Sequence, residues 1–193
     1  MTRFVYATAT TLDGYLADAD SSLDWLFAVD GGDEAQAELS GFFDGVGVLV
    51  MGSTTYEWVL EHEDLLASPE KWQGFYGDRP TYVFTSRTDR TPIPGADIRF
   101  VDGAVAEHLE AIRAAAASGD VWVMGGGDLA AQFAAVGHLD EIQLSVAPVL
   151  LGAGALLFTG ELHSDRLELV DVHQTGQFAQ LTYRVVKVAS DPR

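Results

Sequence analysis

Two glycine-containing turns stand out in this sequence, because each joins an apolar run to a helical pattern. The first follows residues 46–51 and consists of Gly52, Ser53, Thr54 and Thr55. The second follows residues 121–124 and consists of Gly125, Gly126, Gly127, Asp128 and Leu129. A helix N-terminus presents free N–H groups and the positive end of its dipole, and glycine lets a ligand approach the backbone. Either turn alone fits an ordinary strand-to-helix connection, so the case for a phosphate site depends on what accompanies them.

Helix-start signals accompany both turns. Thr54 and Glu57 have the spacing of a capping box, in which each side chain bonds a free N–H at the helix start. Asp128 has the side chain of an N-cap for a helix that runs to Ala135. Both signals predict that a helix begins directly after the glycines.

A locally basic stretch supplies a partner for an anion. Between Arg79 and Arg99 the sequence has four arginines and two aspartates, although the net charge of the chain is -18. Arg87 follows the apolar run of residues 81–85. Charge alone leaves open whether this stretch binds a ligand or is solvated loop. Together with the two turns, it favours a nucleotide site.

Other chemistries find little support in the sequence. The Gly125-x-Gly127-x-x-Ala130 spacing satisfies a relaxed dinucleotide fingerprint, but it lies late in the chain and lacks the acid expected about 20 residues later. No serine-hydrolase elbow or P-loop is present, and the five histidines have no metal-ligand spacing. We therefore expect no metal. The absence of cysteine also excludes disulfides and a thiolate nucleophile.

The acidic residues concentrate at the start of the chain. Residues 1–66 include 13 acidic residues and one basic residue. Residues 67–193 include 16 acidic residues and 10 basic residues. Such a charge disfavours nucleic acid and anionic membranes as partners. With no signal peptide and no apolar run of 18 residues, the sequence leads us to expect a cytoplasmic protein without a membrane partner.

Apolar runs alternate with helical patterns along the chain. Continuous runs predict strands buried on both faces of a parallel sheet, at residues 4–9, 46–51, 81–85 and 121–124. Apolar periodicity predicts helices at residues 104–117 and 128–135. Later runs predict a strand at residues 139–147 and a hairpin formed by residues 167–175 and 178–188. The predicted architecture is α/β, with a mostly parallel sheet, an antiparallel C-terminal hairpin, one domain over residues 1–189 and a frayed tail at 190–193.

The order of six motifs over about residues 3–187 resembles the dihydrofolate reductase-like superfamily. The most similar branch contains the reductase half of the riboflavin-pathway deaminase-reductases. The motifs are Thr11-Leu12-Asp13-Gly14-Tyr15, Ser22-Leu23-Asp24-Trp25, Met51-Gly52-Ser53-Thr54-Thr55-Tyr56-Glu57, Phe84-Thr85-Ser86-Arg87, Met124-Gly125-Gly126-Gly127-Asp128-Leu129 and Ala147-Pro148-Val149-Leu150-Leu151-Gly152 with Leu157-Phe158.

The resemblance implies a three-layer α/β/α fold that binds NADPH across the strand ends. It assigns the turn at residues 52–55 to the cofactor phosphates, and Thr85, Ser86 and Arg87 to the adenosine ribose and its 2′-phosphate. In the family the glycine pair within residues 125–127 often contains a cis peptide, and the following helix carries the pyrophosphate. An arginine fork suits a dianionic phosphate.

The chain also departs from the family pattern. Ser53 stands where dihydrofolate reductases usually have arginine, which removes one phosphate contact. The preference for NADPH over NADH therefore remains open. Two carboxylates compete for the catalytic role. Asp30 follows Trp25 at a spacing similar to the pterin-binding acid, and Asp13 lies in the Leu-Asp-Gly motif. Either residue could instead form a turn.

The resemblance implies an NADPH-dependent reductase that transfers hydride to a C=N or C=O carbon of a small heterocyclic or sugar-like substrate. A ribosylaminopyrimidine phosphate of riboflavin biosynthesis is one such substrate, although the acidic N-terminal third suits a phosphate poorly. The zinc deaminase half is absent, since its signature needs cysteine. A dihydrofolate or pterin reductase and a non-catalytic nucleotide-binding dimer remain as alternatives. Relatives commonly form homodimers, and the hairpin of residues 167–188 could contribute to the interface.

Overall fold

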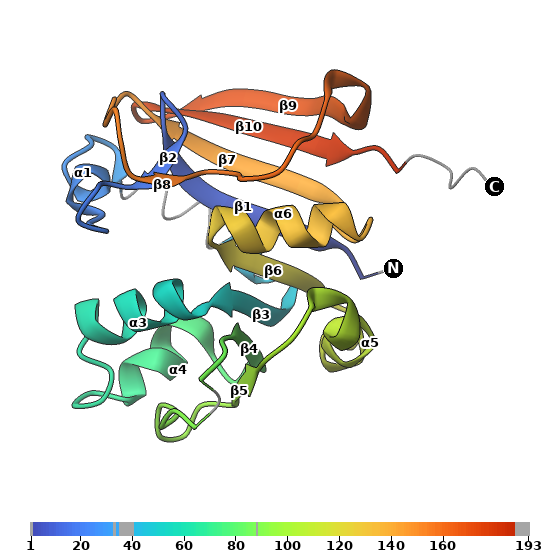
Figure 1. Cartoon of the computed structure of the whole chain (residues 1–193). Helices are drawn as coiled ribbons and strands as arrows, with labels where there is room; N and C mark the ends of the chain where they lie inside the picture. Colours follow the sequence, from blue (N-terminus) through green and yellow to red (C-terminus); the bar gives the residue numbers. More distant parts are fainter. Residues whose placement is uncertain (1, 33, 35–40, 88, 188–193) are drawn as a thin grey trace, which may run out of the picture.

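One twisted sheet organises the molecule (Figure 1). The computed structural model describes residues 2–32, 34, 41–87 and 89–187. Within them, eight strands take the order β5-β4-β3-β6-β1-β7-β10-β9. They are β1 (Phe4–Thr11), β3 (Val46–Gly52), β4 (Thr81–Phe84), β5 (Ile98–Val101), β6 (Asp120–Gly125), β7 (Glu141–Ala147), β9 (Leu167–Thr175) and β10 (Phe178–Val185). All neighbours pair in parallel except β10, which is antiparallel to both β7 and β9.

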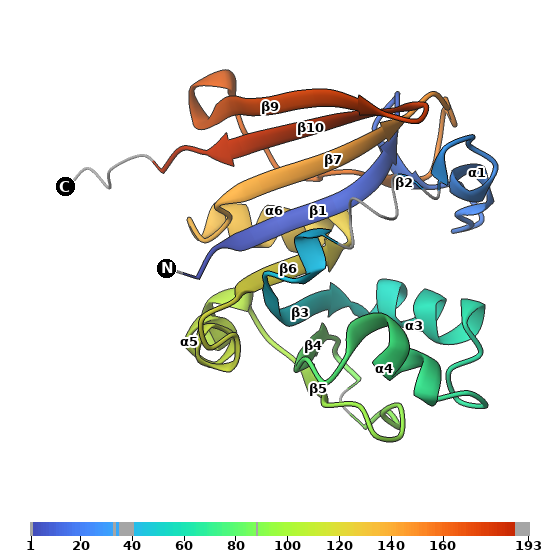
Figure 2. The same ribbon diagram turned by 180° about the vertical axis from the view of Figure 1, so that it is seen from behind.

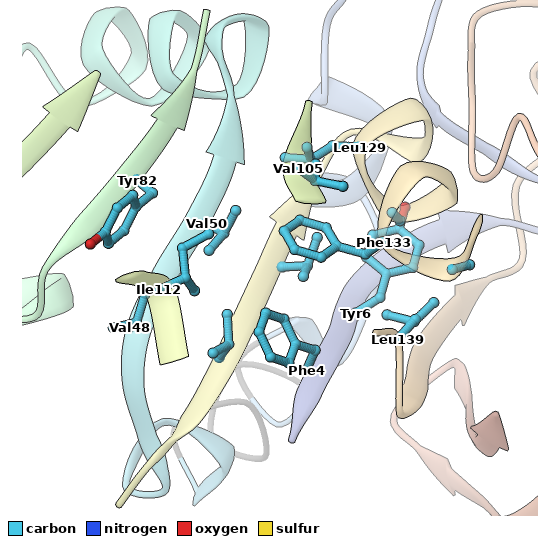
Figure 3. Packing of buried hydrophobic residues seen from close by; sticks show 14 of the residues in the cluster. Phe4, Tyr6, Val48, Val50, Tyr82, Val105, Ile112, Leu129, Phe133 and Leu139 are labelled. Carbon is cyan, nitrogen blue, oxygen red and sulfur yellow. The ribbon is translucent and has the colours of Figure 1, made fainter. Parts of the chain in front are cut away.

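Helices cover both faces of the sheet, because alternate residues of its central strands are apolar on each side. Val48 and Val50 of β3 belong to the core packed by α5 (Val105–Ala115) and α6 (Gly127–Ala135). Figure 3 shows this core, with Phe133 of α6 directed at the strands. Leu49 and Met51 belong to the opposite core, packed by α3 (Ser53–His62) and α4 (Glu70–Tyr76).

Smaller elements cross the end of the sheet to which the parallel strands point. Strand β2 (Tyr15–Ala17) pairs with β8 (Ala155–Leu156), and α1 (Asp24–Phe27) lies beside them. A short 3-10 helix, η1 (Ser164–Arg166), precedes β9. Figure 1 shows α1, β2 and β8 on the left, where the parallel strands end, and the start of β1 and the end of β10 on the right.

The predicted fold class is confirmed. The strand expected at residues 167–175 has those bounds, and its partner ends at Val185 within the described residues. Residues 188–193, which include the end of the expected hairpin and the tail, lie outside them. Short elements without strong apolar runs were not anticipated: α1, α4, β2, β5 and β8. No helix of the described residues is long and apolar enough to cross a membrane.

Candidate functional site

The three turns predicted to hold a cofactor meet at one edge of the sheet. Strands β4, β3 and β6 are adjacent and parallel, so their carboxyl ends lie side by side. Gly52 pairs with Phe84, and Met51 pairs with Gly125. The segments that follow, including Arg87, therefore leave the sheet together. This edge is where open α/β sheets bind ligands.

The first turn leads into α3 without a side-chain cap. Gly52 is the N-cap residue and the helix begins at Ser53, so the predicted capping box of Thr54 and Glu57 is wrong. The helix starts two residues earlier than the box requires, and the Glu57 carboxylate accepts a hydrogen bond from Arg87 instead. A Cβ added at Gly52 would meet no atom within 4 Å. The helix start is thus open, with N–H groups that no side-chain cap satisfies.

The second turn leads into α6 in the same way. The peptide bond between Gly125 and Gly126 is cis, as the family resemblance implied. Gly126 is the N-cap, so the prediction that Asp128 caps this helix is also wrong. The Asp128 carboxylate lies in the first turn and accepts hydrogen bonds from Gln132 Nε2 (2.8 Å) and Thr159 Oγ1 (3.4 Å). The Leu129 side chain belongs to the core, which leaves only its backbone for a ligand.

Gly127 fixes how closely α6 approaches the loop after β8. A Cβ at this position would lie 2.3 Å from the Leu156 carbonyl oxygen and 2.6 Å from that of Leu157. The Leu157 carbonyl also accepts a hydrogen bond from the Tyr6 hydroxyl (2.8 Å). Burial raises the pKa of Tyr6, which keeps this donor protonated. The helix start is therefore held by backbone packing.

Two arginines near the first turn share one carboxylate. Glu57 of α3 forms ion pairs with Arg87 (3.2 Å) and with Arg90. The Arg87 side chain is 68% exposed, and its backbone N–H donates to Thr85 Oγ1 (3.1 Å). Arg87 can therefore reach an incoming anion, although Glu57 competes for its guanidinium.

The two candidate acids occupy different surroundings. The Asp13 carboxylate accepts hydrogen bonds from Thr11 Oγ1 (2.6 Å) and from the backbone N–H groups of Gly152 (2.7 Å) and Leu151 (3.0 Å). The Thr11 hydrogen bond first, and then that of Gly152, lower the pKa of Asp13. These contacts favour the turn-forming alternative, in which Asp13 joins the loops after β1 and β7. Asp30 is exposed in the segment after α1.

A cavity of about 420 Å³ lies on the sheet face opposite α5 and α6. Its apolar walls come from Leu26 and Phe27 of α1, from Phe42, and from Trp122, Met124 and Phe178. Its floor carries uncharged polar side chains from β7 and β10: Gln143, Ser145, Gln180 and Thr182. Figure 2 shows this face, with α4 over the β3–β4 half of the sheet. Met124 directly precedes Gly125, so the cavity adjoins the second glycine turn.

The segment after α1 is held over the cavity from two sides. Phe27 stacks on His62 of α3, with ring centroids 5.2 Å apart. Gly31 touches the turn between β9 and β10, since a Cβ at Gly31 would lie 2.7 Å from Gly176 Cα. Both glycines have positive φ angles, which glycine adopts without steric cost. Asp30 lies in this segment, between Phe27 and Gly32, which both line the cavity.

The polar floor was missed by the sequence analysis. Ser145 and Gln180 are paired across β7 and β10, as are Gln143 and Thr182, so all four side chains point to one face. The signal was the alternation of polar and apolar residues in these two strands. It was hidden because the same alternation is typical of any strand with one solvated face.

The fold is that of a dihydrofolate reductase. The structure of dihydrofolate reductase from Enterococcus faecalis complexed with NADP(H) and RAB-propyl matches with a TM-score of 0.60 and 14% identity, covering 95% of this chain and 96% of that one. At this identity the likeness concerns the fold alone.

The family follows from the sequence. A model of the RibD C-terminal domain matches residues 3–181, and the chain belongs to this family. It is 30% identical to the uncharacterized protein YwjB of Bacillus subtilis (strain 168) over 181 residues, 94% of this chain and 97% of that protein. The structure of a candidate riboflavin biosynthesis protein from Shewanella sp. PV-4 matches with a TM-score of 0.76 and 26% identity, over 97% of this chain and 100% of that one.

Proposed function

We propose that this protein is an NADPH-dependent reductase that transfers hydride to a C=N or C=O carbon of a small heterocyclic or sugar-like molecule. The observation that carries the proposal is the convergence of two open helix N-termini and Arg87 at one sheet edge, directly beside a cavity. Membership of the RibD C-terminal domain family supports a reductase of this kind.

The residues at this edge fit a dinucleotide. A Cβ at Gly52 or Gly126 would meet open space, so a ligand can come close to the backbone in front of either helix. The N–H groups at the starts of α3 and α6 would hold phosphate oxygens, with Ser53, Thr54 and Thr55 as hydroxyl donors. Thr85, Ser86 and Arg87 would hold the adenosine ribose and its phosphate. Bound there, NADPH would supply the hydride.

The protein would otherwise align the reactants and exclude water. Phe27 and the segment to Gly32 cover the cavity, and Trp122 of β6 forms part of its wall. Asp30, two residues before the cavity-lining Gly32, would be the proton donor, whereas Asp13 would position the loops around the cavity. This assignment keeps both predicted acids in the site, with different tasks.

Titration of the protein with NADPH, NADH and a flavin tests the proposal directly. Trp122 lines the cavity and Trp58 lies on α3, so we expect NADPH to quench tryptophan fluorescence saturably, with NADPH favoured over NADH. A reductase should then oxidise NADPH when a substrate is supplied. Failure of all three ligands to bind would refute the oxidoreductase assignment.

We also propose a homodimer that uses strand β9. This edge strand exposes Leu169, Val170 and Val172, each at least 46% accessible. Exposed apolar side chains on an edge strand favour association with another surface. Light scattering should give a dimer for the wild type and a monomer for Val172→Asp, and a monomeric wild type would contradict the proposal.

A further inference from the structure

The cavity on the β7–β10 half of the sheet lacks, in its described lining, the basic side chains that a phosphorylated substrate of riboflavin biosynthesis would need. Its floor side chains are amides and hydroxyls, and neither lysine nor arginine lines it among the described residues. Protein sites that hold a phosphate monoester rely on arginine, lysine or a helix N-terminus. The N-termini of α3 and α6 belong to the neighbouring cofactor edge.

The described chain segments that border this cavity carry no lysine or arginine near it. The sequence contains no lysine or arginine between Arg3 and Lys71, so no residue of the first strand, of α1 or of the segment after it can supply one. In the C-terminal strands, Arg184 pairs with Glu168 and Lys187 with Asp140. Both lie at the opposite end of the sheet, because Arg184 is in register with Glu141 at the start of β7.

Carboxylates surround the cavity instead. Asp171 of β9 is in register with Thr182 of the cavity floor, and its Oδ2 lies 2.6 Å from Nδ1 of His173, which lines the cavity. Asp24 and Asp30 are exposed on and after α1, whose residues Leu26 and Phe27 line the cavity. A phosphate dianion would meet these carboxylates without a lysine or arginine in the described lining of the cavity, and such repulsion disfavours binding.

The floor offers a hydrogen-bonding edge for an uncharged ring. Ser145 Oγ donates to Gln180 Oε1 (2.6 Å), which fixes the amide, while Gln180 Nε2 is buried without a partner in the described part of the chain. A buried N–H without an acceptor is costly, so a ligand carbonyl here would be favoured. Gln143 Nε2 donates to Glu141, which leaves the Gln143 carbonyl as an acceptor for a ligand N–H.

We infer that this cavity binds an uncharged, planar heterocycle that carries a carbonyl next to an N–H group and no phosphate. Phe27, Trp122 and Phe178 provide aromatic surface for a ring, and about 420 Å³ suits two fused rings with a short substituent. The inference rests on the proposed function only in calling this molecule the substrate. It separates this protein from reductases of phosphorylated ribosylaminopyrimidines.

The test compares two fluorescent probes that differ only in a phosphate group: 6-hydroxymethylpterin and its phosphate monoester. Both probes are titrated into the Arg87→Ala variant without NADPH. Binding of the phosphate group at the proposed cofactor edge then does not contribute to the measured affinity. We expect the neutral probe to bind at least tenfold more tightly. Equal or tighter binding of the ester, or binding of neither probe, would overturn the inference.

A matched pair of variants locates the binding. Gln143→Leu removes a floor amide and should weaken the neutral probe about tenfold, whereas Gln73→Leu makes the same change on the exposed face of α4 and should have no effect. If Gln143→Leu unfolds, Ser145→Ala serves instead, since it removes the hydroxyl that fixes Gln180. Unchanged affinity in a folded floor variant would place the probe elsewhere and contradict the inference. Because no cofactor is present, failure of NADPH binding leaves this result intact.

Discussion

The two halves of the sheet present opposite kinds of recognition surface at the same edge. On the β4–β3–β6 half, the site consists of backbone N–H groups at two helix starts and one exposed arginine. On the β1–β7–β10 half, the cavity is built from neutral amides, hydroxyls and aromatic rings. The first surface suits a polyanion and the second an uncharged ring.

The difference shows how an acidic chain can recognise an anionic cofactor. Helix dipoles and backbone N–H groups are independent of residue charge, so the β3 and β6 turns need few basic side chains. The described lining of the other half's cavity consists of neutral amide and hydroxyl side chains and aromatic rings, so we expect its specificity to come from side-chain hydrogen bonds. We therefore expect the net charge of -18 to limit the proposed substrate more than the proposed cofactor.

The largest effect is expected from adding one methyl group at the α6 turn. In Gly127→Ala the new Cβ would lie 2.3 Å from the Leu156 carbonyl oxygen, and overpacking of this kind costs about 1–3 kcal/mol. Gly126→Ala is the control, because its Cβ meets no protein atom within 4 Å. Thermal melts should show a lower Tm for Gly127→Ala only.

One of these two variants also tests whether a ligand binds in front of α6. Gly126→Ala should keep its stability but bind NADPH about tenfold more weakly, equivalent to ~1.4 kcal/mol, since the methyl group occupies the space proposed for the ligand. Wild-type affinity for NADPH in this variant would show that no ligand approaches α6 there.

Arg87→Ala should separate the two nicotinamide cofactors. Hydrogen bonds to charged groups contribute about 1.5–3 kcal/mol, so we expect NADPH affinity to fall about 10–100-fold. NADH lacks the 2′-phosphate and should bind as to the wild type. Arg99→Ala, which breaks an ion pair with Asp97 on β5, is the matched control and should change neither affinity. Fluorescence titrations give all the values.

Glu57→Gln should act in the opposite direction and more weakly. The Glu57 carboxylate pairs with Arg87 and Arg90, and its loss frees Arg87 for a phosphate. Exposed ion pairs contribute about 0.2–1 kcal/mol, so NADPH should bind about two- to fivefold more tightly. Glu61→Gln on the same helix should leave affinity unchanged. Weaker NADPH binding in Glu57→Gln would contradict competition for Arg87.

Asp13→Asn should have the smallest effect and should depend on pH. Hydrogen bonds from Thr11 and Gly152 lower the pKa of Asp13, so its ionised form stabilises the fold above its unfolded pKa, about 3.9. That stability is lost as pH falls through the lowered folded pKa. We expect a Tm lower than wild type by a few degrees at pH 7, converging in acid, while Asp20→Asn melts like wild type. Loss of turnover without loss of Tm would instead make Asp13 the catalytic acid.

The sequence predicted the fold well where strands are buried on both faces. The runs at β3, β6 and β1 are continuous and apolar, so periodicity alone identified them. Edge strand β5 and the two-residue strand β8 carry no such signal, because exposed or very short strands have no apolar requirement. The helix caps were mispredicted because the side-chain type alone does not determine which residue is the N-cap. Thr54 and Asp128 have capping side chains, but the glycines before them already take the N-cap position.

Local sequence was enough to indicate the glycine turns and Arg87, because phosphate recognition by helix starts depends on a few neighbouring residues. Only the tertiary structure brought Gln143, Ser145, Gln180 and Thr182 to one cavity floor, since strand register decides which polar side chains share a face. It also turned Glu57 from a cap into a partner of Arg87, through contact between segments 30 residues apart. The sequence by itself determined the acidic charge and the strand-end chemistry, while long-range pairing decided where an uncharged ligand can bind.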